Sequence, residues 1–250
     1  MTSPLYIPSR KRWLDAPTIK ETLEQGMQPM VVVPQEEVGA YRVAFPTATV
    51  IGTAAHGIGP TRQFILEHAR ASGAERFWML DDDLDDPRTR EHFMAPYTFL
   101  PWPDWLAAIE DLTNDPRIGA ATGMTRQYGW PEDSAIPNKR VGYAILMRTA
   151  MPVTYWPFLH EDTDMTLQIL RAGFRTIKLP QFVFHTTTMG WRGGGCGQDY
   201  EAGADERAGD VLLRKWEAIV PGLVRLTKNK EGKTVTRIKW SVFRQEGTFS

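Results

Sequence analysis

The 250-residue chain contains a single cysteine, Cys196, so it can form neither an intrachain disulfide nor a zinc site made of cysteines alone. It also has no run close to the roughly 20 apolar residues that a membrane helix needs, and its N-terminus lacks a signal-peptide core. We therefore expect a protein of a reducing cytoplasm that has no membrane partner.

The chain has no excess of charge of either sign. Its formal net charge is −1, which gives no overall electrostatic reason to bind nucleic acid. The charge is nevertheless uneven, because residues 211–250 hold nine Lys or Arg against three Glu, and nine minus three gives +6. This basic segment predicts either a surface for a polyanion or an ordinary solvated face.

Length and composition favour a single α/β domain. The hydrophobic content of 42% and charged content of 24% are ordinary for a globular protein, and two independent domains would both be small at this length. We assign residues 1–205 to the main domain. Residues 206–250 are expected to form a helix and a basic hairpin packed on it.

An apolar run that ends in acid is the central feature of the sequence. Residues 76–80 predict a buried strand, and Asp81, Asp82 and Asp83 follow it directly. In an open α/β sheet, ligands bind beyond the carboxyl ends of the strands. Crowded carboxylates raise one another's pKa unless a cation lies among them, so a divalent metal is one explanation. A solvated acidic loop over residues 81–86 is the other.

Two further segments suit a phosphate-bearing ligand. The strand predicted at residues 5–8 runs into Ser9 and three cations, Arg10, Lys11 and Arg12. Glycines at 57 and 59 precede a helix that carries Arg62, and the positive end of a helix can bind an anion. Each segment can equally be a basic surface or a plain loop.

Acidic residues also open the helix predicted from residue 161 to residue 172. Glu161, Asp162 and Asp164 fall in its first turn, where acids commonly complement the helix dipole. A carboxylate there could instead act as a general base. His185 ends the strands predicted at 176–180 and 182–184, as a core or rim residue or as a metal ligand.

The remaining periodicity predicts an alternation of helices and strands. Helices are expected at residues 18–25, 60–72, 104–114 and 208–220, and strands at 30–34, 49–52, 118–123, 141–147, 224–227 and 234–240. Residues 126–139 and 186–198 are expected to be loops, the second rich in glycine.

The order of these parts resembles the GT-A glycosyltransferases, particularly the inverting family 2 types, over roughly residues 5–190. The motifs are the D-x-D run at 81–83, the Glu161-Asp162 helix start and His185 at the end of a late strand. Residues 160–174 and the later segment Trp191-Arg192-Gly193-Gly194-Gly195 resemble the phage TET-associated glycosyltransferases. One departure is Thr61-Arg62-Gln63, where many family 2 members have Arg-Asn.

The resemblance implies a mixed sheet flanked by helices, with a C-terminal helix and hairpin as an extension. It also implies a nucleotide-sugar donor, expected to be a UDP-sugar, and Mn²⁺ or Mg²⁺ as cofactor. The implied metal ligands are Asp83, His185 and Asp81, and the implied donor-binding residues are Pro8, Ser9, Arg10, Arg62, Asp81, Asp82, Trp191, Arg192 and Gly193. Asp162 would be the general base and Glu161 would orient the acceptor.

The closer family implies that the acceptor is 5-hydroxymethylcytosine in DNA, in the host cytoplasm if the chain is phage-encoded. Three alternatives stay open: a saccharide or other small acceptor, a metal-dependent nucleotidyltransferase that releases pyrophosphate, and a non-catalytic binding module that stacks ligands on some of the nine tryptophans. The sequence leaves the sugar and the oligomeric state open.

Overall fold

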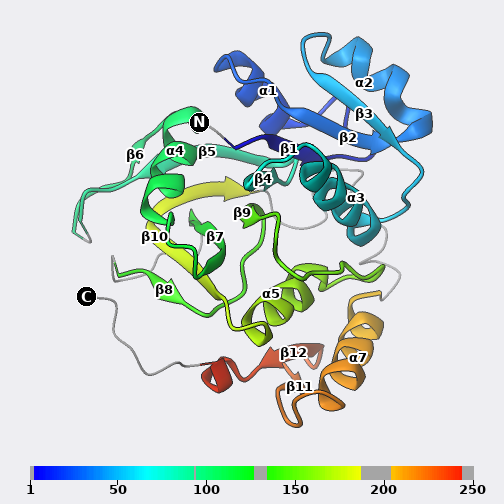
Figure 1. The fold of residues 1–250 in the computed structure, drawn as a ribbon, viewed down its shortest axis with the longest axis vertical. Coiled ribbons are helices and arrows are strands. Elements are labelled where there is room, and N and C mark those ends of the chain that lie inside the picture. Colours follow the sequence, from blue (N-terminus) through cyan, green and yellow to red (C-terminus); the bar gives the residue numbers. More distant parts are fainter. Residues whose placement is uncertain (1–2, 93, 127–133, 187–203, 244–250) are drawn as a thin grey trace.

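The computed structural model describes residues 3–92, 94–126, 134–186 and 204–243. A ten-stranded mixed sheet forms its centre (Figure 1). The first strands are β1 (Leu5–Pro8), β2 (Met30–Pro34), β3 (Thr49–Thr53), β4 (Arg76–Leu80) and β5 (Leu84–Thr89). They are followed by β6 (Thr98–Phe99), β7 (Ile118–Thr125), β8 (Ile136–Pro137), β9 (Ala144–Arg148) and β10 (Arg175–Thr186).

The strand order is β3-β2-β1-β4-β9-β7-β10-β5-β6, and β8 pairs with β10. Strands β3, β2, β1 and β4 are mutually parallel, as are β7 and β10. The remaining pairs are antiparallel. The expected mixed α/β architecture is confirmed.

Helices cover both faces of the sheet. The core on one face includes residues of α1 (Pro17–Glu24), α2 (Val38–Ala44) and α4 (Trp102–Leu112). The core on the other face includes residues of α3 (Ile58–Ala71) and α5 (Glu161–Arg171). A 3₁₀ turn, η1 (Gln35–Glu37), precedes α2. No helix in the described part of the chain is long and apolar enough to cross a membrane.

Strand β4 is buried on both sides, which explains its unbroken apolar run. Trp78 and Leu80 belong to one core, Phe77 and Met79 to the other, and none of the four is more than 1% exposed. Side chains alternate between the faces of a strand, so each face requires its own apolar set. The buried central strand expected from the sequence is confirmed.

The acidic stretch after β4 is not a solvated loop. Asp82 is only 6% exposed, and β5 begins at Leu84, so the loop alternative for residues 81–86 is wrong. The strands expected at 176–180 and 182–184 are a single strand, β10, whose register against β7 shifts between Lys178 and Val183. An irregularity there accommodates Pro180, which cannot donate a ladder hydrogen bond.

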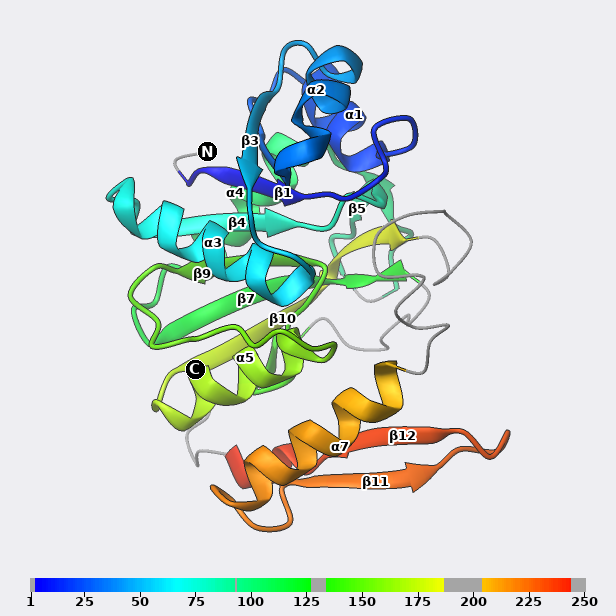
Figure 2. The same cartoon turned by 90° about the vertical axis from the view of Figure 1, so that its right-hand side faces the viewer.

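The C-terminal helix and hairpin pack beside α5 (Figure 2). They comprise α7 (Ala204–Glu217), β11 (Val224–Lys228), β12 (Thr234–Ile238) and the 3₁₀ turn η3 (Trp240–Phe243). Leu167 of α5 shares a small apolar core with Leu212, Trp216, Leu223 and Val224. The expected extension is therefore present. The boundary proposed between residues 205 and 206 falls inside α7, and that division of the chain stays a prediction.

Asp164 joins α5 to α7 through polar contacts of its side chain. Its carboxylate accepts hydrogen bonds from Lys215 Nζ at 2.6 Å, Trp216 Nε1 at 2.7 Å and Gln168 Nε2 at 2.8 Å. Its side chain is 0% exposed. Although it lies in the first turn of α5, Asp164 therefore binds side chains rather than acting as a solvated helix cap.

We expect Asp164→Ala to lower the free energy of unfolding by about 3 kcal/mol, because it leaves Lys215 and the Trp216 indole without their buried acceptor. Urea unfolding measures the change. Asp104→Ala is the matched control, since Asp104 also lies in the first turn of a helix but is exposed. Equal losses in the two variants would show that Asp164 acts only through the helix dipole.

Candidate active site

The carboxyl ends of β1 and β4 lie at the same edge of the sheet because the two strands are parallel. The beginning of α3 packs there against the segment that leads into α5. A Cβ on Gly59 would lie 1.7 Å from the carbonyl oxygen of Trp156, so only glycine permits this approach. The glycine-rich helix start therefore brings α3 close to the acidic first turn of α5.

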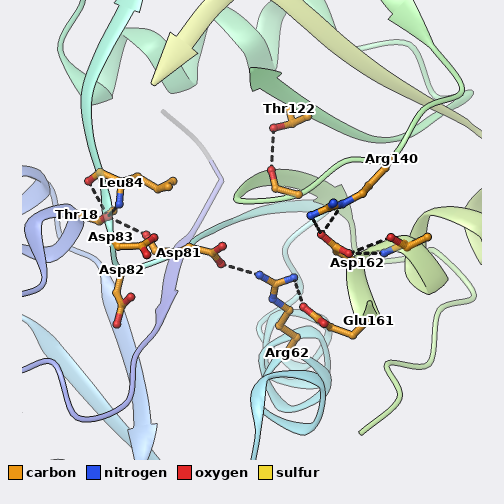
Figure 3. Close-up of polar contacts among 12 residues, drawn as sticks. Thr18, Arg62, Asp81, Asp82, Asp83, Leu84, Thr122, Arg140, Glu161 and Asp162 are labelled. Carbon is orange, nitrogen blue, oxygen red and sulfur yellow. Dashed lines mark hydrogen bonds and ion pairs between the residues drawn. The ribbon is translucent and has the colours of Figure 1, made fainter. Parts of the chain in front are cut away.

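Arg62 connects the acidic end of β4 with the acidic start of α5 (Figure 3). Its Nη2 donates to Asp81 Oδ1 at 2.6 Å, and its Nη1 donates to Glu161 Oε1 at 2.8 Å. The residue is 3% exposed. Burial opposes its charge, but the carboxylates of Asp81 and Glu161 raise the pKa of Arg62 above its ordinary value. A predicted donor-binding residue thus contacts one predicted metal ligand and one predicted catalytic residue.

Glu161 and Asp162 are adjacent carboxyl groups in different electrostatic surroundings. Burial raises the pKa of Glu161 to about 7, Arg62 opposes the shift, and the neighbouring Asp162 adds to it. Burial also disfavours the charged form of Asp162, but Arg140 and Arg62 hold the pKa of that carboxyl below its usual range. Asp162 is therefore ionised at neutral pH and available as a proton acceptor, whereas its surroundings favour the protonated form more strongly at Glu161.

Arg140 is a residue of this site that the sequence did not indicate. Its Nε donates a hydrogen bond to Asp162 Oδ2 at 2.8 Å, and its Nη2 forms an ion pair with the same oxygen at 2.6 Å. Thr163 N donates to the other carboxylate oxygen, Oδ1, at 2.6 Å. Arg140 follows a stretch that was expected to be an irregular loop, and no local pattern distinguishes it from any surface arginine.

Asp82 differs from its two neighbours in the D-x-D run. It points away from Asp81 and Asp83 (Figure 3). The Ser9 hydroxyl donates to it through a short hydrogen bond, and Arg12 Nη1 donates to Asp82 Oδ1 at 2.6 Å. Burial raises the pKa of Asp82 to about 7, with Arg12 opposing the shift. Asp82 and Ser9 thus connect the ends of β4 and β1, and their part in donor binding stays a prediction.

Two more predicted donor residues lie at the end of β1. Pro8 is buried as the last residue of the strand, and Arg10 is half-buried just beyond it. Arg12 reaches a second aspartate as well, because its Nη1 lies 3.1 Å from Asp83 Oδ2. Trp191, Arg192 and Gly193, predicted to face the donor, lie outside the described residues.

Asp81 and Asp83 suit a hard divalent cation. Their side chains are 25% and 22% exposed and lie close together at the end of β4 (Figure 3). Burial raises the pKa of Asp81, Arg62 lowers it, and the charge of Asp83 raises it further. A cation between two such carboxylates would relieve their repulsion, and carboxylate oxygens are the ligands that Mg²⁺ and Mn²⁺ prefer.

His185 lies beside a different acid. Its Nδ1 is 2.7 Å from Asp85 Oδ1 in β5, and its side chain is 42% exposed. Among the residues that the structure describes, no three His, Cys, Asp or Glu side chains are grouped closely enough to hold a metal ion. The metal role of His185 therefore stays a prediction, and the carboxylates of Asp81 and Asp83 form the best-suited pair.

Two solved structures are distantly similar to this chain. A UDP-glucose pyrophosphorylase complexed with UDP-glucose has a TM-score of 0.42 and 10% identity, covering 75% of this chain and 92% of that chain. A protein described as a nucleotide-diphospho-sugar transferase from Desulfovibrio desulfuricans G20 has a TM-score of 0.40 and 12% identity, covering 82% and 83%. Neither likeness is strong enough to bear on activity.

The family comparison is more informative. No curated relative matches the chain. The model of the TET-associated glycosyltransferases matches residues 3–194, which include the D-x-D run, Arg62, Glu161, Asp162 and His185. A match over most of the chain disfavours the nucleotidyltransferase and the non-catalytic binding module. The chain belongs to the TET-associated glycosyltransferase family.

Proposed function

We propose that this glycosyltransferase moves a sugar from a UDP-sugar to the hydroxymethyl group of 5-hydroxymethylcytosine in DNA, with inversion at the anomeric carbon. The observation that carries the proposal is the position of Arg62 between Asp81 and Glu161. It supports one site in which the D-x-D carboxylates lie near the proposed base, Asp162. A donor diphosphate and an acceptor hydroxyl need such neighbouring groups.

The proposed reaction is a single displacement. Asp162 takes the proton of the acceptor hydroxyl as its oxygen forms a bond to the anomeric carbon. The bond between that carbon and the diphosphate oxygen breaks, and UDP leaves with the electron pair. When held by Asp81 and Asp83, Mn²⁺ or Mg²⁺ would supply positive charge to stabilise the departing diphosphate. Glu161, restrained by Arg62, orients the acceptor beside Asp162.

The C-terminal hairpin supports DNA as the acceptor. Its exposed cations are Arg225, Lys228, Lys230, Lys233, Arg237 and Lys239. Arg225 and Arg237 are direct cross-strand partners, and like charges in such positions destabilise a hairpin. A polyanion would offset that repulsion. The alternative is that the lysines only prevent edge-to-edge pairing of the hairpin with another chain.

The direct test incubates the protein and Mn²⁺ with individual nucleotide-sugars and duplexes containing either cytosine or 5-hydroxymethylcytosine. Mass spectrometry of the digested DNA should show one added sugar only on hydroxymethylated cytosine. The coupling constant of the anomeric proton, compared with that of the donor, shows whether the configuration inverts. Transfer only to free saccharides would contradict the DNA proposal, and retention of configuration would contradict the single displacement.

We expect DNA affinity to fall steeply with salt, because lysine contacts with phosphates release counterions. Gln replaces four exposed lysines in the test variant, Lys228, Lys230, Lys233 and Lys239. The slope of log affinity against log salt should become shallower by about 1 for each lost phosphate contact. Gln at Lys20, Arg42, Arg117 and Arg171, which are exposed elsewhere, removes the same charge as a control. Equal slopes in wild type and the hairpin variant would favour the edge-protection role.

A further inference from the structure

A polar pocket lies directly beside Asp162. Its volume is about 230 Å³, and its wall includes Thr122, Arg140, Gly142, Tyr143 and Lys178. A cavity of about 150 Å³ already admits a benzene ring, so this pocket has room for a planar ring with a polar substituent. The D-x-D aspartates are not among the residues that line the pocket.

Two contacts join the pocket to the proposed base. Arg140 lines the pocket and binds Asp162 Oδ2 through Nε and Nη2. A Cβ on Gly142 would lie 2.7 Å from the same oxygen, so the Asp162 carboxylate packs directly against Gly142 in the pocket wall. A molecule in the pocket therefore lies within reach of the atom that would accept the proton.

Lys178 gives the pocket a cation. It is half-buried in β10, and its amine makes no hydrogen bond or ion pair within the described residues. Burial and the nearby Arg140 lower the pKa of Lys178 to about 8, and Asp162 opposes the shift. Placing an ammonium group in partly buried surroundings costs free energy, which an anionic ligand would offset.

Arg140 and Tyr143 both line the pocket. The Arg140 guanidinium lies 5.6 Å from the centre of the Tyr143 ring. The Thr122 hydroxyl donates to Gly142 O at 3.2 Å, which holds β7 against the segment before β9. Two cations and an aromatic ring in one small pocket suit a ligand with an anionic group next to a planar ring.

We propose that this pocket receives the acceptor nucleotide and that Lys178, together with Arg140, binds its phosphate group. The inference rests on the proposed function, because it takes the acceptor to be a hydroxymethylated cytosine nucleotide. It adds the residues that recognise the acceptor, and it gives a role to a lysine whose amine has no hydrogen-bond partner among the described residues. Arg140 would then contact both the phosphate and Asp162, the proposed general base, and so fix the position of the acceptor relative to Asp162.

The first test compares two small acceptors that differ only in the phosphate, 5-hydroxymethyl-deoxycytidine and its 5′-monophosphate. For the wild type we expect a KM about tenfold lower for the nucleotide, the value of one hydrogen bond to a charged group. Lys178→Gln should abolish this preference, and Lys178→Arg should retain most of it. Lys20→Gln, which removes an exposed charge elsewhere, should leave the preference unchanged.

The pH dependence supplies a readout that a merely structural lysine would not show. The nucleotide preference should fall as pH rises above about 8, because the Lys178 amine loses its charge there. The groups that act on this amine are Arg140, Asp162 and Lys139. Arg140 and Asp162 stay charged in this range. Asp162 raises the pKa of Arg140, and Arg140 lowers the pKa of Asp162 although burial acts in the opposite direction. The phosphate is fully ionised above its second pKa of about 6.

A binding test separates this inference from the proposed function. Inorganic phosphate titrated into the ¹⁵N-labelled protein should shift the amide signals of Thr122, Tyr143 and Lys178 in the wild type but not in Lys178→Gln. Shifts without any sugar transfer to hydroxymethylcytosine would support the anion site and overturn the proposed function. Sugar transfer with equal KM values for the two acceptors would overturn the anion site alone. A loss of UDP affinity in Lys178→Gln would assign the pocket to the donor and overturn the acceptor proposal.

Discussion

Asp162→Asn should lower turnover by about 10²–10⁴-fold while donor binding persists, because the amide keeps the shape of the side chain but cannot accept the proton. Asp162 is suited to this role by its ionised state, which Arg140 and Arg62 maintain despite burial. Turnover at saturating substrate and UDP affinity measure the two effects separately.

The matched control is Glu161→Gln, the same chemical change at the adjacent position. Glu161 contacts Arg62, and its pKa is raised to about 7 by burial. If Glu161 only orients the acceptor, this variant should lose less activity than Asp162→Asn and should raise the KM for the acceptor. A larger loss in Glu161→Gln would transfer the base role to Glu161. Loss of donor affinity with unchanged turnover in Asp162→Asn would make Asp162 a donor-binding residue.

Asp83→Ala should lower the metal-dependent affinity for UDP by more than about 100-fold, since even outer-shell partners of a metal site typically contribute about 10–100-fold. The reason is that the side chains of Asp83 and Asp81 lie together at the end of β4 (Figure 3) and are both partly exposed. Calorimetric titration of UDP with and without Mn²⁺ measures the metal-dependent part. Full activity in excess chelator would contradict the metal assignment altogether.

His185→Ala distinguishes two arrangements of that metal site. If His185 is a further ligand, the variant should weaken UDP binding only in the presence of Mn²⁺. If its contact with Asp85 is its whole role, the Mn²⁺-dependent affinity should be unchanged. Because the His185 side chain is 42% exposed, a general loss of folding is a poor explanation for any effect.

The sequence by itself determined the strand that delivers the aspartates and the helix that carries Glu161 and Asp162. Both signals are local: five consecutive apolar residues are needed where β4 is buried on two faces, and an acidic first turn followed by periodic apolar residues marks a helix. The resemblance to the family was also carried by such local motifs in a particular order. Local signals do not record a strand that lacks a regular apolar pattern. The sequence therefore did not predict β5, which begins directly after the three aspartates.

Only the tertiary structure decided which charged groups meet. Arg62 and Glu161 are 99 residues apart, and Ser9 and Asp82 are 73 apart, so no local pattern records either contact. The three aspartates are indistinguishable in sequence, yet Asp82 is buried against β1 while Asp81 and Asp83 stay partly exposed. The structure also identified Arg140 and Lys178 as candidate site residues, because sheet pairing and the packing of α5 place both around one pocket beside Asp162. Ionisation states and ligand preferences depend on such neighbours, and folding brings them together across long stretches of chain.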